Sequence, residues 1–427
     1  GSLRASRSEN SRASGKASPY LLAGAALLTG AALLLGPINR TRSELQLRAH
    51  GALSENLPPD IALAQAGLGT FRALATSVLW SRATRLQSEG SHFEALRLAD
   101  WITRLQPRFS AVWSFQAWNM AFNISLATEL PAERWLWVRE GVALLRDRGI
   151  PLNPREVDLY RELSHIFLRK LSGSSDVHHL HYQRQLARQW HALLGPPPGE
   201  GAAGLESWLR PVAEASELYL ENSGSGDLPL DRFLSDVPRA AELLAQLEAL
   251  GVAPGEEVLR EAAAHEPGRL AEWTERNKET PEYARLLAFL RARSLAKDYN
   301  MDPRWMLTLM KGDWVDDGKG EKIPLPLDWR LPEAHCVYWA SLGLHRSRGL
   351  LRPDEYASFY CRSNLLSALS LLKDTGQLTF GRDGEVYRRL PAPGFAPALT
   401  RALKVAAQKY PGIYPEPEAS PPAPSGN

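Results

Sequence analysis

Apolar residues recur at intervals of three and four positions in almost every segment after residue 60. This spacing places them on one face of an α-helix, so each segment is predicted to be an amphipathic helix. The clearest examples in the first half are FRALATSVLWSRATRLQ (71–87), FEALRLADWITRL (93–105), AVWSFQAWNMAFNI (111–124), RWLWVREGVALLRD (134–147) and VDLYRELSHIFLRKL (157–171). Short breaks containing Gly and Pro separate them, which indicates helical hairpins. The pattern predicts an all-α chain organised as an α-solenoid of such hairpins.

The predicted helix at 110–126 is apolar on two faces. One stripe contains Trp113, Ala117, Met120 and Ile124, and the other contains Phe115, Trp118 and Phe122. A helix that is apolar on two faces packs against neighbours on both sides. This helix is therefore expected in the interior of the stack, and its tryptophans are expected in the core rather than on a binding surface.

The chain after residue 195 is predicted to form a second helical region. Residues 196–204 are rich in Pro and Gly and are expected to be a linker. Residues 205–410 return to helical spacing without a fixed period. Within them, residues 378–388 are expected to form a small β-hairpin, because two short segments flank an Arg-Asp-Gly turn. The Pro-rich tail at 411–427 is expected to be disordered.

A long uncharged run lies near the N-terminus. Residues 20–38 contain no charged side chain, and at about 1.5 Å per residue a helix of this length just crosses a bilayer core of about 30 Å. A single-pass transmembrane helix is predicted, preceded by a basic segment at 1–19 and followed by a juxtamembrane connector at 39–64. A cleaved signal peptide is the alternative, although the run is longer than a usual signal core and lacks a clear cleavage site. The positive-inside rule favours a cytoplasmic N-terminus and an exported body, periplasmic in a bacterium.

Residues 65–195 resemble the tetratricopeptide repeat (TPR). Gly90 between two predicted helices, Ala95 early in the second helix and Pro107 at the end of the unit match that family in residue type and spacing. The resemblance implies stacked helical hairpins that bind a protein or a peptide.

The repeat is divergent and has its own period. Arg82 stands where the family usually has Leu, and Ala99 stands where it has a larger aromatic residue. Trp113 and Tyr160 each follow a proline by six positions, and this pattern repeats after 47 residues rather than the usual 34 or so. Each middle unit is therefore expected to contain about 13 additional residues, and both aromatic residues are expected to be buried between hairpins.

Composition narrows the choice of partner. The net charge of the whole chain is +2, and 23% of its residues are charged and 44% apolar, as in ordinary folded proteins. The basic segment at 1–19 accounts for more than this excess, so no nucleic-acid partner is expected. Cys336 and Cys361 are the two cysteines. They could form one disulfide in an exported body or be buried thiols in a cytoplasmic one, and the simpler alternative is that they are two small core residues.

Four polar residues are candidates for contact with a partner. Gln116, Asn119 and Asn123 lie between the two apolar stripes of the 110–126 helix, three and four positions apart. Amides in such a row can bond the backbone of an extended peptide, and Arg82 could pair with a carboxylate of that peptide. The alternative is that the amides are solvated or bond neighbouring helices.

Three classes of function follow. The leading hypothesis is a membrane-anchored helical-repeat scaffold that binds a protein or peptide. The first alternative is an enzyme with dispersed active-site residues, one form of which would use a metal held by His178 and His181, although no spacing supplies a third ligand. The second is a carrier of hydrophobic ligands that uses the 110–126 helix as a cavity wall. No catalytic residue, metal site or cofactor is assigned, because no motif for one is present.

Overall fold

The computed structural model describes residues 71–173, 175–199, 201–220, 228–263, 270–312, 314, 322–348, 350, 354–381 and 387–414. The chain divides into two units, Gly1–Leu57 and Pro58–Asn427, and every described residue belongs to the second. The predicted transmembrane helix at 20–38, with its flanking segments at 1–19 and 39–64, lies outside the described residues. Among the residues that are described, no helix combines the length and the apolar character that crossing a bilayer requires.

The described chain is mostly helical and contains one two-stranded antiparallel sheet. In chain order its elements are α3 (Phe71–Ser88), α4 (His92–Leu105), α5 (Ser110–Trp118), η1 (Asn119–Ile124), α6 (Ser125–Ala127), α7 (Pro131–Ala143), η2 (Leu144–Gly149), α8 (Ile150–Leu152), α9 (Val157–His165), η3 (Ile166–Ser172), α10 (His179–Leu194), α11 (Gly201–Leu220), α12 (Leu230–Asp236), α13 (Pro238–Ala249), α14 (Glu256–Ala263), α15 (Ala271–Asn277), α16 (Pro281–Lys297), α17 (Pro303–Met310), α18 (Pro332–Arg346), α19 (Glu355–Thr375), β1 (Gln377–Phe380), β2 (Tyr387–Leu390), η4 (Pro393–Phe395) and α20 (Ala396–Lys409). The prediction of a helical chain with one small hairpin is confirmed.

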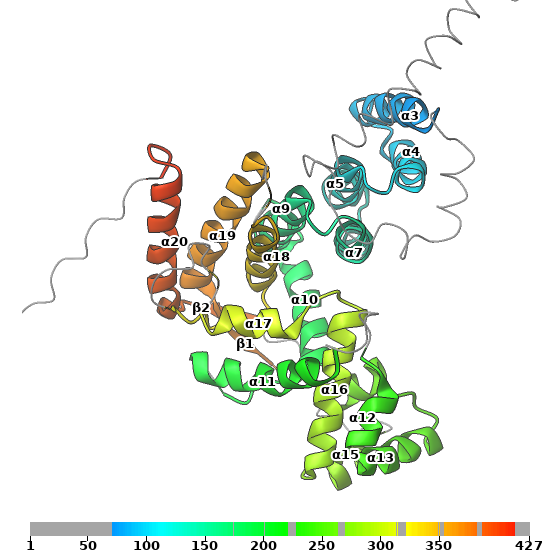
Figure 1. Cartoon of the computed structure of the whole chain (residues 1–427), viewed down its shortest axis with the longest axis vertical. Helices are drawn as coiled ribbons and strands as arrows, with labels where there is room; N and C mark the ends of the chain where they lie inside the picture. The colour runs from blue at the N-terminus through cyan, green and yellow to red at the C-terminus, as the bar shows by residue number, and fades with distance from the viewer. Residues whose placement is uncertain are drawn as a thin grey trace, which may run out of the picture. The chain divides into compact units, whose positions relative to one another are not determined.

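Consecutive helices between residues 71 and 194 pair as hairpins. α3 packs on α4, α5 with η1 packs on α7, and α9 with η3 leads into α10 (Figure 1). α5 also contacts both α4 and α9, so that neighbouring hairpins share contacts. Pro131 begins α7 at a position where its missing N–H costs nothing, because the first N–H groups of a helix have no partner within it.

The 47-residue period is visible in the hydrogen bonds. Trp113 Nε1 donates to the carbonyl oxygen of Pro107 over 2.8 Å, and the Tyr160 hydroxyl donates to that of Pro154 over 2.8 Å. Both rings are buried, as predicted, with 1% of their surface exposed. Each bond satisfies a buried polar atom of the ring and fixes the turn that precedes its helix.

Two π-helical segments also obey this period. η1 begins at Asn119 and η3 begins at Ile166, 47 residues later. A π-helix contains more residues per turn than an α-helix, so side chains within it point in directions that regular α-helical spacing does not predict. This matters for the candidate site, since Asn119 and Asn123 both lie in η1.

The C-terminal helices pack on the middle of the first region. α18 and α19 both contact α9, and α18 also contacts η3 (Figure 1). Gly343 permits this approach, because a Cβ at this position would lie 2.6 Å from Cβ of Tyr160. One cluster of buried apolar residues runs from α5 to α20, so the two predicted helical regions share a core. The predicted linker at 196–204 is also shorter than expected, since α11 begins at Gly201, where φ is +72°.

The C-terminal region also contains the two cysteines and the two-stranded sheet. Cys336 and Cys361 are buried free thiols and do not form a disulfide. In the sheet, Gln377 pairs with Leu390 and Phe380 with Tyr387. The turn of the hairpin lies outside the described residues. In the tail at 411–427, the first four residues form a turn closed by a bridge between Pro411 and Tyr414, and the rest are not described.

Candidate functional site

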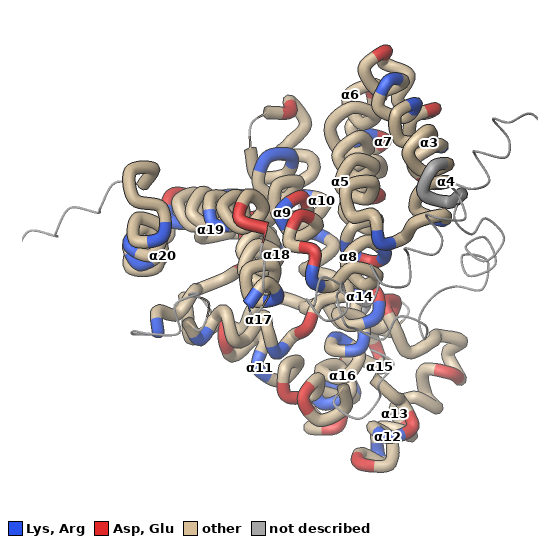
Figure 2. The backbone as a smooth tube through the Cα atoms, turned by 45° about the horizontal axis from the view of Figure 1, so that its top comes forward, with Lys and Arg blue, Asp and Glu red and all other residues tan. Residues whose placement is uncertain are grey.

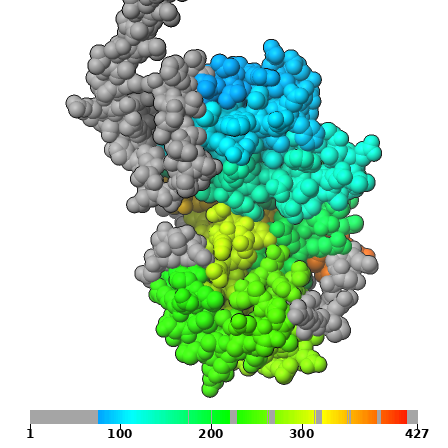
Figure 3. Space-filling view, turned by 90° about the vertical axis from the view of Figure 1, so that its right-hand side faces the viewer, coloured from blue at the N-terminus to red at the C-terminus, as the bar shows by residue number. Residues whose placement is uncertain are grey.

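A groove of about 620 Å³ lies between α4, α5 with η1, and α7 with η2. Its lining residues are Leu96, Arg97, Asp100, Trp101, Arg104, Gln116, Met120, Glu140, Ala143, Leu144, Asp147 and Arg148. Figure 1 shows α4, α5 and α7 as neighbours, and Figure 3 shows the surface of the helices from α3 to α7, coloured blue to cyan, as one continuous region. The volume lies within the range of about 300–1,000 Å³ that is typical of ligand sites.

α4 supplies one wall of the groove through its polar face. Arg97, Trp101 and Arg104 are four and three positions apart, so they share a face of the helix. Trp101 is 60% exposed. On α5, Trp118 is 37% exposed, so the prediction that the tryptophans of the 110–126 helix lie in the core is confirmed for Trp113 and wrong for Trp118. Arg104 Nε donates to Asp100 Oδ2 over 3.0 Å, so these two side chains are paired with each other. The apolar residues of this wall are Leu96 and Trp101, and the indole of Trp101 is the larger side chain.

α7 and η2 supply the opposite wall. Asp147 accepts two hydrogen bonds from Arg146, at 2.6 and 2.8 Å, and the Arg148 guanidinium lies 5.5 Å from the ring centroid of Trp113. The whole lining contains three arginines and three carboxylates, so its charges balance. Basic and acidic residues are likewise interleaved along most helices (Figure 2). A surface of this kind has no net preference for an anion or a cation, and it matches a ligand that presents both hydrogen-bond donors and acceptors.

Gln116 is the polar residue of α5 that lines the groove. Only 4% of its surface is exposed, and its Oε1 atom is buried without a hydrogen-bond partner among the described residues. A buried acceptor without a partner costs about 1–3 kcal/mol. A ligand that donates an N–H to this atom would recover that free energy, and the backbone of a peptide offers such donors at every residue except proline.

The structure does not bring the other three predicted residues to the groove. Asn119 is fully buried and its Nδ2 donates to the backbone oxygen of His92 over 3.1 Å. Asn123 is half-buried, and its Nδ2 donates to Asn119 Oδ1 over 2.9 Å. These amides therefore join η1 to the beginning of α4, as in the alternative in which they bond a neighbouring helix. Arg82 is exposed on α3 and does not line the groove.

Sequence reasoning missed the contribution of α4. The signal was present, because Trp101 interrupts an otherwise charged face between Arg97 and Arg104. An aromatic residue on the polar face of an amphipathic helix is not needed for the core, and such residues are enriched in binding surfaces. The residues of α7 gave no comparable signal, since charged residues on a helix face are ordinary.

The acid–base groups with the most perturbed pKa values lie away from the groove. Burial raises the pKa of Glu162 on α9 to about 7, and burial also lowers the pKa of His165, one turn later, to about 4. Neither side chain lines the groove. In the part of the chain that the structure describes, no group of three or more His, Cys, Asp or Glu side chains gathers in the way a metal site needs, at His178 and His181 or elsewhere.

No protein-family model, no curated protein and no solved structure matches this chain.

Proposed function

We propose that the chain is a membrane-anchored scaffold whose TPR-like helical repeats bind an extended segment of another protein in the groove between α4, α5 and α7. The observation that carries the proposal is Gln116, a buried amide in the lining whose oxygen has no partner among the described residues. In this proposal, residues 20–38 anchor the protein in the membrane, with the N-terminus cytoplasmic and the helical body on the exported side.

The stacked hairpins support the α-solenoid part of the proposal. α3 with α4, α5 with α7, and α9 with α10 follow one another, and the last two pairs share the 47-residue correspondence of Trp113 with Tyr160. Repeat proteins of this kind commonly present their helices to an extended ligand. The 47-residue unit is longer than a standard TPR because α7 continues into η2 and α8 before the next unit begins.

The lining of the groove supports a peptide as the ligand. An extended peptide offers backbone N–H groups for Gln116, apolar side chains for Trp101 and charged side chains of both signs for the arginines and carboxylates. The side chains with strongly perturbed pKa values lie elsewhere, so the groove offers no evident acid–base machinery for an enzyme.

Photocrosslinking in native membranes tests the proposal. A benzophenone amino acid at Arg97 places the reactive group in the groove, and the same amino acid at Arg82 places it on exposed α3 outside the groove. We expect a protein adduct from position 97 and much less from position 82. Equal adducts from both positions, or only lipid adducts from position 97, would contradict a peptide groove.

Matched substitutions then identify the contacts. Trp101→Ala and Gln116→Leu should each reduce the yield of the position-97 adduct by about tenfold, because each removes roughly 1–2 kcal/mol of binding free energy. Phe93→Ala is the control, since Phe93 lies on the same helix with 53% of its surface exposed but does not line the groove. A loss of adduct in Phe93→Ala as large as in Trp101→Ala would show that the groove is not the binding surface.

A further inference from the structure

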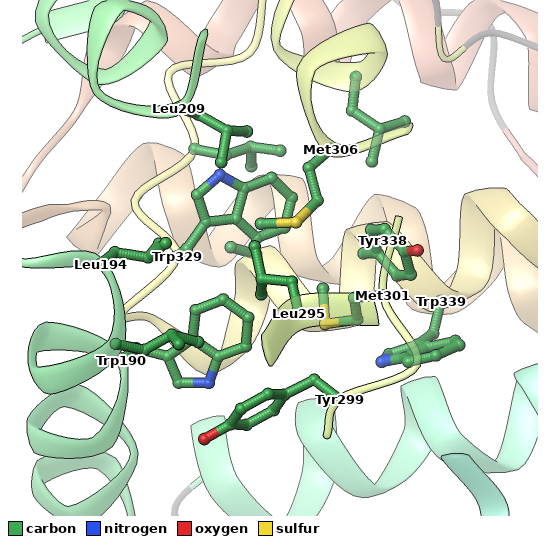
Figure 4. Packing of buried hydrophobic residues seen from close by; sticks show 14 of the residues in the cluster. Trp190, Leu194, Leu209, Leu295, Tyr299, Met301, Met306, Trp329, Tyr338 and Trp339 are labelled. Carbon is green, nitrogen blue, oxygen red and sulfur yellow. The ribbon is translucent and has the colours of Figure 1, made fainter. Parts of the chain in front are cut away.

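A second cavity lies on the other side of α7, with a volume of about 360 Å³. It shares Glu140 and Ala143 with the groove, but most of its lining comes from η3, α10, α18 and the connection between α16 and α17. Ring-bearing side chains supply part of its walls, namely those of Trp135, Phe167, Trp190, Tyr299, His335 and Trp339. Figure 4 shows the rings of Trp190, Tyr299 and Trp339 grouped with Met301.

The aromatic rings hold one another in fixed positions. The His335 ring stacks on Phe167 with centroids 4.8 Å apart and meets the Trp190 ring edge-on at 4.4 Å. Trp190 also meets Tyr299 edge-on at 5.4 Å. Rings packed in this way cannot collapse into the space without losing these contacts. The cavity is therefore a formed site, because its walls are held in place without a ligand.

A few polar groups converge on this aromatic space. Trp339 Nε1 is buried and has no hydrogen-bond acceptor among the described residues. His335 Nε2 lies 2.9 Å from the backbone oxygen of Trp329, so Nε2 is the donor and Nδ1 is the acceptor of the neutral ring. Burial keeps the ring neutral, because it lowers the pKa of His335 to about 3. The Tyr299 hydroxyl accepts a hydrogen bond from Gln189 Nε2 over 2.8 Å.

The charged residues in the lining disfavour an anionic ligand. There are two positive and three negative side chains, namely Arg139, Arg146, Glu140, Glu256 and Asp298. Both arginines already have partners, since Arg139 pairs with Glu140 and Arg146 pairs with the carboxylate of Asp147. A cation is also disfavoured, because the Arg146 guanidinium already lies over the Tyr299 ring, 4.9 Å from its centroid. The ligand that best matches these charges and rings is a neutral, flat molecule.

We propose that this cavity binds a small, neutral aromatic heterocycle whose ring nitrogen accepts a hydrogen bond from Trp339 Nε1. The heterocycle would stack among the rings of Trp190, Tyr299 and Trp339, and a donor group on it would reach His335 Nδ1. The inference is independent of the peptide groove, since it rests on a different set of side chains.

Two probes that differ by a single ring atom test the hydrogen bond. Benzimidazole and indole both have a ring N–H, but only benzimidazole has a second ring nitrogen that accepts a hydrogen bond. Binding to the full chain in lipid nanodiscs is measured by calorimetry at about pH 8, where both probes are neutral, and empty nanodiscs correct for partition into lipid. We expect the protein to bind benzimidazole about tenfold more tightly than indole. Equal affinities, or no saturable binding of either probe, would overturn the proposal.

Two matched tryptophan variants test whether the probes bind in this cavity. Trp339→Phe keeps an aromatic ring but removes the donor, so the preference for benzimidazole should vanish. Trp329→Phe is the control, because Trp329 is equally buried and its Nε1 also has no partner among the described residues, yet it does not line the cavity. The preference should survive in Trp329→Phe. Its loss in both variants to the same extent would show that the cavity is not the binding site.

A cavity-filling variant keeps the test decisive if Trp339→Phe does not fold. Leu186 lines the cavity, and Leu186→Trp would occupy the space with a larger ring. Variants are first checked by their circular dichroism melting curves. In a folded Leu186→Trp protein, binding of both probes should fall at least tenfold. Unchanged binding would overturn the proposal, whatever the outcome for Trp339→Phe.

Discussion

At the scale of single residues, Gln116 and Asn119 are two buried amides of the same helical segment that differ in their hydrogen bonds. The pattern placed Gln116 and Asn119 on one polar stripe, and both are buried in the structure. Asn119 finds a backbone oxygen on a helix 27 residues earlier in the chain, whereas Gln116 Oε1 finds no partner. Whether a buried amide has a hydrogen-bond partner depends on which backbone carbonyl the fold places opposite it, and local sequence pattern does not contain that information. The sequence pattern therefore grouped Gln116 with Asn119 and Asn123, and of these three the structure brings only Gln116 to the lining of the groove.

Glu162 is a buried acid whose protonation is linked to folding. One carboxylate oxygen lies 3.0 Å from Arg161 Nη2, but Oε1 is buried without a partner among the described residues. Burial, opposed by Arg161, raises the pKa of Glu162 from 4.5 to about 7. Between these two values the folded protein holds a proton that the unfolded chain has lost. The contribution of Glu162 to stability is therefore present below about pH 4.5 and is lost as the pH rises through about 7.

We predict that Glu162→Gln stabilises the protein at about pH 8 by up to about 3 kcal/mol, and changes stability little near pH 5. Gln keeps the shape of the side chain without the buried negative charge. The measurement is the difference in melting temperature between variant and wild type at the two pH values. This difference cancels the contribution of His165, whose lowered pKa destabilises the protein as the pH falls. Glu214→Gln, at an exposed position of α11, is the control and should show no such pH dependence.

At the scale of elements, the sequence predicted most helices but not all of their partners. Local spacing predicted the hairpins between residues 71 and 194, the 47-residue period and the small sheet. It did not predict that α18 and α19 pack on α9, because contacts between distant segments leave no periodic pattern. One signal was available: α18 is buried on nearly all of its faces, and its sequence is apolar around the helix rather than on one stripe.

The close crossing of α18 and α9 gives a prediction at this scale. Gly343→Ala would place a methyl group 2.6 Å from Cβ of Tyr160, so the two helices would have to move apart. We expect the free energy of unfolding to fall by about 1–3 kcal/mol, as in other overpacked cores. Thermal or urea unfolding measures this change. Gly255→Ala is the matched control, because a Cβ at that position meets nothing within 4 Å; an equal loss in both variants would mean that the crossing is not the cause.

At the scale of the whole molecule, we predict that the helical body folds without the proposed anchor. None of the described helices has the length and apolar character to cross a bilayer. Deleting residues 1–45 removes the uncharged run at 20–38 and leaves every described element in place. We predict that the shortened protein remains in the supernatant when membranes are sedimented, with an unchanged melting temperature, whereas the full chain sediments with them. Co-sedimentation of the shortened protein without aggregation would point to another membrane contact.

The packing of α18 and α19 on α9 also sets an order of events while the chain is being made. Asn364 on α19 donates a hydrogen bond to Ser164 on α9, and 200 residues separate them. At a synthesis rate of about 5–20 residues per second, the partner of α9 leaves the ribosome roughly 10–40 s after α9 itself. Throughout that interval, the face of α9 that carries Tyr160 and Ser164 is open to water and to other chains. The N-terminal hairpins of this protein therefore depend on helices that are synthesised much later, and a shorter chain that ended after α10 would leave this face uncovered permanently.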